Sequence, residues 1–123
     1  MAGGRAELGE DGVSSAAAAG KARLVLLASD AAENTVRRAR NFTEGSHAVV
    51  LSVPFNKETL GAACGRGSCA MLAITESGLA LSAAVKLAAA FPGSYEDAVE
   101  ALQAKDERIR RRRGKKRPRK TES

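Results

Sequence analysis

Residues 24–40 read LVLLASDAAENTVRRAR, and the change of pattern inside this stretch indicates the fold. The first five residues, Leu24–Ala28, form a continuous apolar run, which is typical of a short strand covered on both faces. The run ends at Ser29 and Asp30, two residue types that cap helix N-termini, so one of them is expected to cap a helix over residues 31–40. A buried strand that passes through a polar corner into a helix predicts an α/β fold.

The same alternation of short apolar runs and helical segments continues along the chain. The other expected elements are an extended piece at 6–8, strands at 48–53 and 70–74, and helices at 10–19, 57–63, 76–90 and 95–113. Gly20 is the expected stop of the first of these helices, and Asn56 and Ser94 are the expected caps of two others. This order predicts a three-layer α-β-α sandwich with a small mixed sheet, followed by a basic C-terminal helix and tail.

The domain boundary is expected at the proline-glycine pair that follows the alanine-rich helix. Residues 1–92 are predicted to form the α/β domain, and residues 93–123 a C-terminal helix with a basic, disordered tail.

Charge is distributed unevenly along the chain, and this matters more than the total of +6. Residues 106–123 contain ten Lys or Arg and three Asp or Glu, a net charge of +7, whereas residues 1–105 contain ten and eleven, a net charge of −1. Such a cationic block is the electrostatic footprint of nucleic-acid binding, although it can also be a solvated segment without a partner. Aromatic residues make up only 3% and there is no Trp, which argues against recognition by rows of base-stacking side chains.

Several classes of function lack their residues in this sequence. No Ser/His/Asp set, Cys–His pair or phosphate-cradling Gly-Lys loop is visible, so the chain is expected to be no enzyme and to take no cofactor or small-molecule substrate. Cys64 and Cys69, with His47, are too few for a zinc site, so no metal is expected and both thiols are predicted to be reduced. The N-terminus has no apolar signal segment and no run approaches the ~18–20 residues of a membrane span, so a cytoplasmic protein without a membrane partner is predicted.

Four pieces of the sequence resemble a known family. They are AGGRAELGEDGVSSAAAAGKA from residue 2, LVLLASDAAENT from residue 24, VPFNKETLGAACG from residue 53 and CAMLAITESGLA from residue 69. Their order and spacing resemble the kink-turn RNA-binding ribosomal protein superfamily, whose archaeal member is of the L-seven-Ae type, and most closely its bacterial YlxQ-like branch. The resemblance extends from residue 2 to residue 90 and implies that the first helix of the family is shortened here.

The resemblance implies that one end of the sandwich contacts structured RNA, such as ribosomal RNA. The family's glycine, asparagine, glutamate and lysine fall on Gly9, Asp11, Gly12 and Ser15, so only the glycine is retained and a standard kink-turn RNA is expected to bind weakly. The RNA-binding residues predicted from the resemblance and from the charge pattern together are Gly9, Glu10, Asp11, Ser15, Asp30, Val36, Arg37, Arg38, the loop residues Gly65, Arg66, Gly67 and Ser68, and the tail residues Arg110, Arg111, Arg112, Arg113, Lys115, Lys116 and Arg117.

These observations predict a small, ribosome-associated RNA-binding protein that acts in translation and uses one end of the sandwich and a basic tail. The alternative is a protein–protein adaptor whose tail only adds charge and solubility. Salt separates the two predictions, because RNA binding releases counterions and weakens steeply with added salt, whereas an apolar interface does not.

Overall fold

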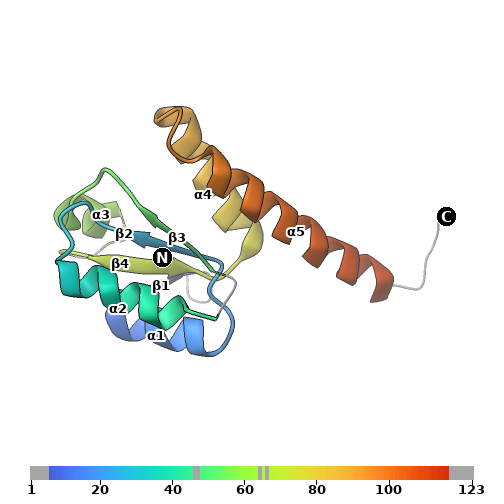
Figure 1. Cartoon of the computed structure of the whole chain (residues 1–123), viewed down its shortest axis with the longest axis horizontal. Coiled ribbons are helices and arrows are strands. Elements are labelled where there is room, and N and C mark those ends of the chain that lie inside the picture. Colours follow the sequence, from blue (N-terminus) through green and yellow to red (C-terminus); the bar gives the residue numbers. More distant parts are fainter. Residues whose placement is uncertain (1–5, 46–47, 64, 66, 117–123) are drawn as a thin grey trace. The chain divides into compact units, whose positions relative to one another are not determined.

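The computed structural model describes residues 6–45, 48–63, 65 and 67–116, with the backbone alone described for residues 109–116. Its elements, in chain order, are β1 (Ala6–Leu8), α1 (Gly9–Ala18), β2 (Leu24–Leu27), α2 (Glu33–Thr43), β3 (Val49–Ser52), α3 (Lys57–Ala63), β4 (Met71–Ile74), α4 (Ser77–Ala90) and α5 (Glu96–Lys116) (Figure 1). The chain forms two compact units, Met1–Ala80 and Leu81–Ser123, with the boundary inside α4.

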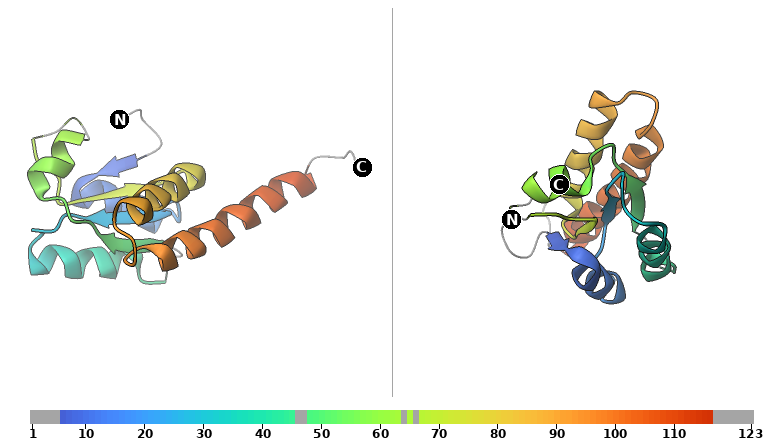
Figure 2. Two further views of the ribbon diagram at one scale, coloured as in Figure 1. Left: turned by 90° about the horizontal axis from the view of Figure 1, so that it is seen from above. Right: turned by 90° about the vertical axis from the view of Figure 1, so that its left-hand side faces the viewer.

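The first unit is built on a four-stranded mixed sheet with the strand order β1-β4-β2-β3. β2 pairs in parallel with β3, and β4 pairs antiparallel with both β2 and β1. α1 and α2 lie side by side against one face of the sheet, and α3 lies on the opposite side (Figure 2). This arrangement confirms the predicted α/β sandwich with a small mixed sheet.

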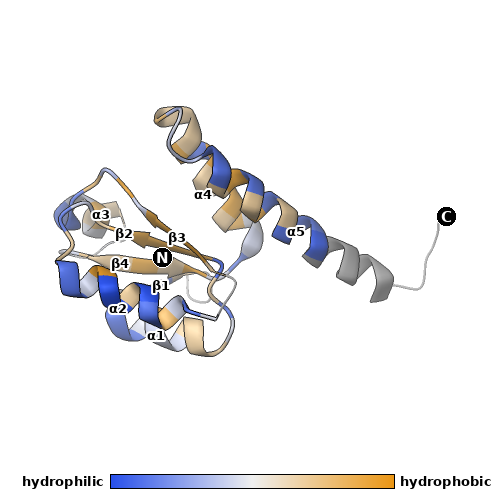
Figure 3. Ribbon diagram, viewed as in Figure 1, coloured by the Kyte–Doolittle hydropathy of each residue, from blue (hydrophilic) through white to orange (hydrophobic). Residues whose placement is uncertain are grey.

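The core of the first unit follows from the alternation of side chains along the two central strands. Every residue of β2 and of β4 is buried, which confirms that the apolar run is covered on both faces. The cluster on the side of α1 and α2 comprises Val13, Ala16, Ala17, Ala22, Val25, Leu27, Ala39, Met71 and Ala73. The alanines of α1 let this helix approach the sheet closely, while the outer face of α2 is hydrophilic (Figure 3). Each buried Leu or Val contributes about 1.5–3 kcal/mol by leaving water.

The start of α2 differs from the prediction. The helix begins at Glu33 with Ala32 as its N-cap residue, and no side chain caps it. The expectation of a Ser29 or Asp30 cap was therefore wrong. The physical reason is that Asp30 has a different partner, described below, so the chain runs two residues further before the helix begins.

The second unit contains most of α4 and all of α5. The Phe91 and Tyr95 rings meet edge to face, with centroids 6.4 Å apart, where the two helices join. α5 begins at Glu96, two residues beyond the expected cap Ser94, and the Glu96 carboxylate accepts hydrogen bonds of 3.0 and 2.9 Å from the Gly93 N–H. This backbone N–H lowers the pKa of Glu96, because it stabilises the ionised carboxylate.

α5 is longer than expected. Its helical backbone continues to Lys116, three residues beyond the predicted end, and residues 117–123 lie outside the described residues. Within the part of the chain that the structure describes, we find no helix with both the length and the apolar character of a membrane span.

Candidate nucleic-acid interface

The strand register brings the predicted interface residues of the first unit to one end of the sheet. Leu8 at the end of β1 pairs with Leu72, and Leu27 at the end of β2 pairs with both Met71 and Ser52. The carboxyl ends of β1, β2 and β3 therefore meet the amino end of β4. We call this end of the sheet the rim and define it by Gly9–Asp11, Ser29–Glu33, Pro54–Glu58, Gly65 and Gly67–Ser68. Ligands of α/β proteins commonly bind beyond the carboxyl ends of strands, so the rim is the natural place for a site.

Asp30 joins two segments of the rim that are far apart in the sequence. Its Oδ1 accepts a hydrogen bond of 2.8 Å from the backbone N–H of Lys57, the first residue of α3. Beside it, the Ser29 N–H donates to the Phe55 carbonyl at 2.8 Å. Asp30 is exposed, as an interface residue should be. Its Oδ1, however, already accepts a hydrogen bond from the backbone at the start of α3.

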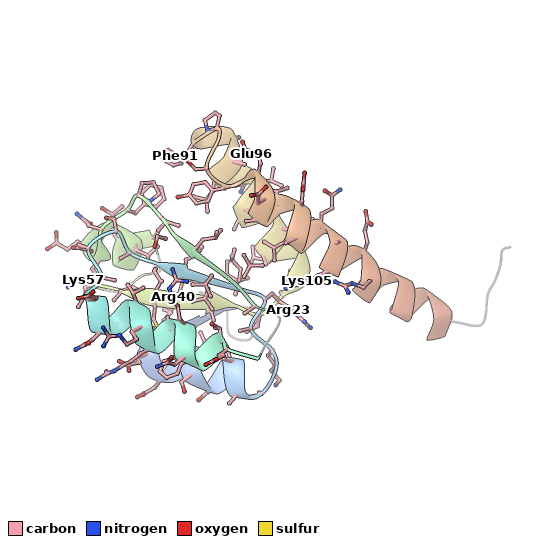
Figure 4. All side chains as sticks on the ribbon, viewed as in Figure 1. Arg23, Arg40, Lys57, Phe91, Glu96 and Lys105 are labelled. Atoms are coloured by element: carbon pink, nitrogen blue, oxygen red, sulfur yellow. The ribbon has the colours of Figure 1, made fainter. Side chains whose placement is uncertain are left out.

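The short helix α3 is fixed at its beginning by local contacts. Asn56 Oδ1 accepts from the Thr59 N–H at 2.7 Å, which confirms the predicted cap. The Lys57 carbonyl then accepts from the Cys69 N–H at 2.9 Å, so the chain entering β4 returns to the start of α3. Figure 4 shows Lys57 at this end of the sheet.

The loop between α3 and β4 lies against the body of α3. A Cβ at Gly61 would stand 2.6 Å from Cα and 2.7 Å from N of Ser68, so only glycine permits this approach. Gly65 has a φ of +78°, and positions 65 and 67 are open, with nothing within 4 Å of an added Cβ. The exposed residues Gly65, Gly67 and Ser68 therefore present backbone to the solvent at the rim, while Arg66 lies outside the described residues.

The cysteine that follows this loop belongs to the core. Cys69 is buried, and its thiol donates to the Met71 carbonyl at 3.1 Å. Cys69 is therefore a small residue of the core, whereas Cys64 and His47 lie outside the described residues. Among the residues that the structure describes, no three His, Cys, Asp or Glu side chains gather as a metal site would require.

The start of α1 carries the positions on which the family motif falls, of which only Gly9 keeps the family's residue. Gly9 has a φ of +82°, a conformation that favours glycine, and it lets the chain turn from β1 directly into the helix. Asp11 and Ser15 are exposed. A Cβ at Gly12 would stand 3.1 Å from Cβ of Glu7, so the glutamate of the family pattern would be crowded at this position and would meet a second carboxylate.

The arginines of α2 are exposed, but each described contact of Arg37 and Arg38 is with a neighbouring side chain of the protein. Arg38 Nη1 forms a salt bridge of 2.8 Å with Glu10 Oε2, and this pair links α2 to the start of α1. Arg37 donates a longer hydrogen bond, 3.4 Å, to Asn34 Oδ1. The arginine and glutamate side chains are 58% and 39% exposed, so the salt bridge contributes at most about 1 kcal/mol. Arg38 can therefore exchange Glu10 for a phosphate at little cost.

Val36 has a different environment from the arginines beside it. It is partly buried and packs against the core cluster beneath α2. Its expected role as an RNA-binding residue stays a prediction.

The described part of the rim carries more negative than positive charge. Its carboxylates are Glu10, Asp11, Asp30, Glu33 and Glu58, and its cationic side chains, counting the two arginines of the adjacent turn of α2, are Lys57, Arg37 and Arg38. Such a surface does not by itself attract the phosphates of RNA. The sequence pattern did not reveal this excess, because its five carboxylates come from three segments that only the folded sheet brings together.

The cationic residues of the C-terminal segment are placed only in part. Arg110–Arg113, Lys115 and Lys116 belong to α5 by their backbone, and their side chains lie outside the described residues. Arg117 lies wholly outside them. The predicted tail is thus helical up to Lys116.

A pocket that the sequence pattern did not predict lies at the opposite end of the sheet from the rim. It has a volume of about 440 Å³ and is lined by Ala17, Ala18, Gly20, Ala22, Arg23, Phe42, Glu44 and Gly45. Arg23, labelled in Figure 4, has a buried Nε without a hydrogen-bond partner among the described residues. An unpartnered buried donor is uncommon, but nothing in the local sequence KARL signals it.

Comparison with known proteins identifies a related fold. No protein-family model matches the chain, and no curated protein matches it. A solved structure from Bacillus halodurans C, described as a protein with unknown function, is similar, with 28% identity and a TM-score of 0.59 over 69% of this chain and 81% of that one. In all, 177 solved chains match. Because one fold serves many functions, the function has to be argued from the residues.

Proposed function

We propose that this protein binds structured RNA, with the basic end of α5 and the residues after it supplying most of the affinity and the rim supplying a second contact. The observation that supports this proposal is the concentration of a net +7 in residues 106–123, beside a remainder of net −1. Cations clustered in this way neutralise phosphates and release their counterions, which is the main source of affinity in nucleic-acid binding. Association with the ribosome is the setting we propose for it.

The rim contributes through its loop rather than through its charge. Gly65 and Gly67 leave the backbone open, so an RNA strand can approach closely, and Arg66 between them offers a planar set of donors for a phosphate or a base. The five carboxylates oppose phosphate binding over the rest of the rim. We therefore infer that a standard kink-turn RNA binds more weakly than the family resemblance implies.

The competing function is that of a protein–protein adaptor, and the excess of carboxylates at the rim favours it. An acidic surface of this kind fits a basic partner protein, and the cationic segment would then serve only to attract partners at long range. The two functions differ in how affinity depends on salt and in whether the ligand needs the basic segment or the rim.

A salt titration of RNA affinity tests the proposal. Fluorescence anisotropy with a labelled kink-turn RNA and a fully paired RNA would be measured from about 0.05 to 0.2 M salt, for the full chain and for a variant lacking residues 108–123. We expect the log–log slope to flatten by several units in the deletion variant, since each lost phosphate contact removes roughly one unit. A second variant, with glutamine at positions 110–113, removes charge without shortening the helix and should flatten the slope as well. An unchanged slope in both variants would exclude the basic segment as the source of affinity.

A further inference from the structure

Five of the seven basic residues between Arg108 and Lys116 are spaced as one face of a helix. Arg108, Arg111, Arg112, Lys115 and Lys116 stand at i, i+3, i+4, i+7 and i+8, and the backbone is helical throughout this range (Figure 1). At about 100° per residue these five positions fall within an arc of about 140°. We call these five positions the cationic stripe.

We propose that the cationic stripe binds a groove of folded RNA as a helix, and not as a flexible polycation. The inference rests on the proposed RNA-binding function and specifies how the basic segment recognises its ligand.

The first argument is that the helix has a nucleus before any RNA arrives. Ala98, Leu102 and Asp106, spaced one turn apart in the first half of α5, are 6%, 3% and 4% exposed, so these turns are packed in place. Starting a helix is the unfavourable step, and each further residue then adds one hydrogen bond. The stripe begins two residues after Asp106 and extends a helix that already exists.

The second argument concerns charge along the helix axis. Glu96 and Asp97 occupy the first turn of α5 and the cations occupy its last turns, which is the polarity that the helix dipole favours. The cations repel each other at i+3 and i+4, and this repulsion weakens the isolated helix. Phosphates placed along the stripe remove the repulsion, so RNA binding and helix formation reinforce each other.

The third argument concerns the shape of the ligand. From Arg108 to Lys116 the stripe is about 12 Å long, at 1.5 Å per residue. The major groove of a regular RNA helix is too narrow and deep for a side chain to read, so a helix fits only where unpaired nucleotides widen the groove. The expected ligand is therefore an RNA stem interrupted by a bulge or internal loop.

Gly114 allows the helix to be changed without changing any charge. Gly114→Pro interrupts the helix inside the stripe, whereas Gly114→Ala favours the helix. Both substitutions leave the number of cations and their positions in the sequence unchanged. The probe is a fluorescein-labelled RNA hairpin with about three unpaired nucleotides on one strand of its stem, compared with the same hairpin fully paired. Far-ultraviolet circular dichroism checks the helix content of both variants. Their thermal midpoints should equal that of the natural protein, because Gly114 lies two turns beyond Asp106. Among the residues of α5 whose side chains are described, Asp106 is the last that is buried.

The two variants give opposite expectations. Gly114→Pro should weaken binding to the bulged hairpin by about tenfold, because the broken helix must be ordered on binding, and Gly114→Ala should bind at least as tightly as the natural protein. The preference for the bulged over the paired hairpin should disappear in Gly114→Pro. Equal affinities for the two variants would overturn the helical mode while leaving RNA binding intact, and no binding by the natural protein at low salt would overturn the proposed function itself.

A pair of single charge removals provides an independent test. Arg112→Gln removes a cation from the middle of the stripe, and its neighbour Arg113→Gln removes one outside it. A flexible polycation would lose the same affinity in both cases, since the net charge changes equally. For a bound helix we expect the stripe variant to lose several times more affinity than its neighbour, and an equal loss would overturn the proposal.

Discussion

Gly61 holds the loop of the rim in place, and adding a single methyl group should displace that loop. The Cβ of Gly61→Ala would stand 2.6, 2.7 and 2.8 Å from Cα, N and C of Ser68, all of them backbone atoms. A side-chain tip could rotate away, but a backbone cannot. Because carbon atoms normally pack at about 3.5–4.0 Å, the loop would have to recede by about 1 Å.

The size of the effect follows from what this movement breaks. Ser68 precedes Cys69, whose N–H bonds to the Lys57 carbonyl at 2.9 Å and whose thiol bonds to Met71. Crowding of this kind costs about 1–3 kcal/mol, and the strained backbone hydrogen bond adds about 1 kcal/mol. Alanine recovers up to about 1 kcal/mol, because it favours a helix more than glycine does. We expect a net loss of about 2 kcal/mol in the free energy of unfolding, or a thermal midpoint lower by roughly 6–10 °C.

Gly78→Ala is the matched control. This glycine also lies in a helix, but its added Cβ would meet only the side chain of Glu76, whose carboxylate oxygens stand 3.3 and 3.4 Å away. A shift of a few tenths of an ångström relieves this contact and keeps the bond that Oε1 accepts from the Leu79 N–H at 2.6 Å. The control should change the free energy of unfolding by less than about 0.5 kcal/mol, measured by urea unfolding alongside Gly61→Ala. Amide hydrogen exchange at Cys69 would report the displaced loop directly. If Gly61→Ala matched the control in stability and kept the protection of the Cys69 amide, the close approach of α3 and the loop would not exist in solution.

Three further predictions concern single side chains. Asp30→Ala should lower the free energy of unfolding, measured in urea, by about 1 kcal/mol, because the Lys57 N–H loses its acceptor, and Asp30→Asn, which keeps an acceptor oxygen, should lose less. A variant that lost RNA affinity but no stability would instead make Asp30 an RNA contact residue. The NMR shift of the Gly93 amide proton should report the titration of Glu96 with a midpoint below the ordinary carboxyl value of 4.5, because the hydrogen bond stabilises the ionised carboxylate. The contribution of this bond to folding is present at neutral pH and is lost as the pH falls through the lowered pKa. A midpoint at or above 4.5 would contradict this prediction. Arg66→Ala should weaken binding of structured RNA by roughly 1–2 kcal/mol without changing the thermal midpoint, and a loss of stability with unchanged RNA affinity would contradict the role of this loop.

Local signals in the sequence determined where the elements form. The helix at 57–63 was predicted to the residue, because Asn56 caps it through a bond to Thr59, only three residues away. The strand at residues 24–27 followed from an uninterrupted apolar run, and Gly20, with a φ of +72°, ended the helix before it as expected. Such signals need only a few neighbouring residues, and the sequence displays them directly.

The α/β fold class was determined by the order of these elements, but the partners of individual side chains were not. Ser29 or Asp30 was predicted to cap the helix that follows, yet Asp30 bonds to a residue 27 positions further along the chain. Arg38 was predicted as an RNA-binding residue, and the sequence did not reveal its salt bridge with Glu10, which spans 28 residues. The excess of carboxylates at the rim likewise appears only when three segments meet.

The physical reason is that periodicity, capping and turn preferences act within about one helical turn, whereas the choice of partner depends on strand register and on which chain segments the sheet places side by side. Glycine at position 61 shows the difference most clearly. In the sequence it is one small residue in a short helix, and only the folded chain, with Ser68 against it, decides that nothing larger than a hydrogen atom fits there.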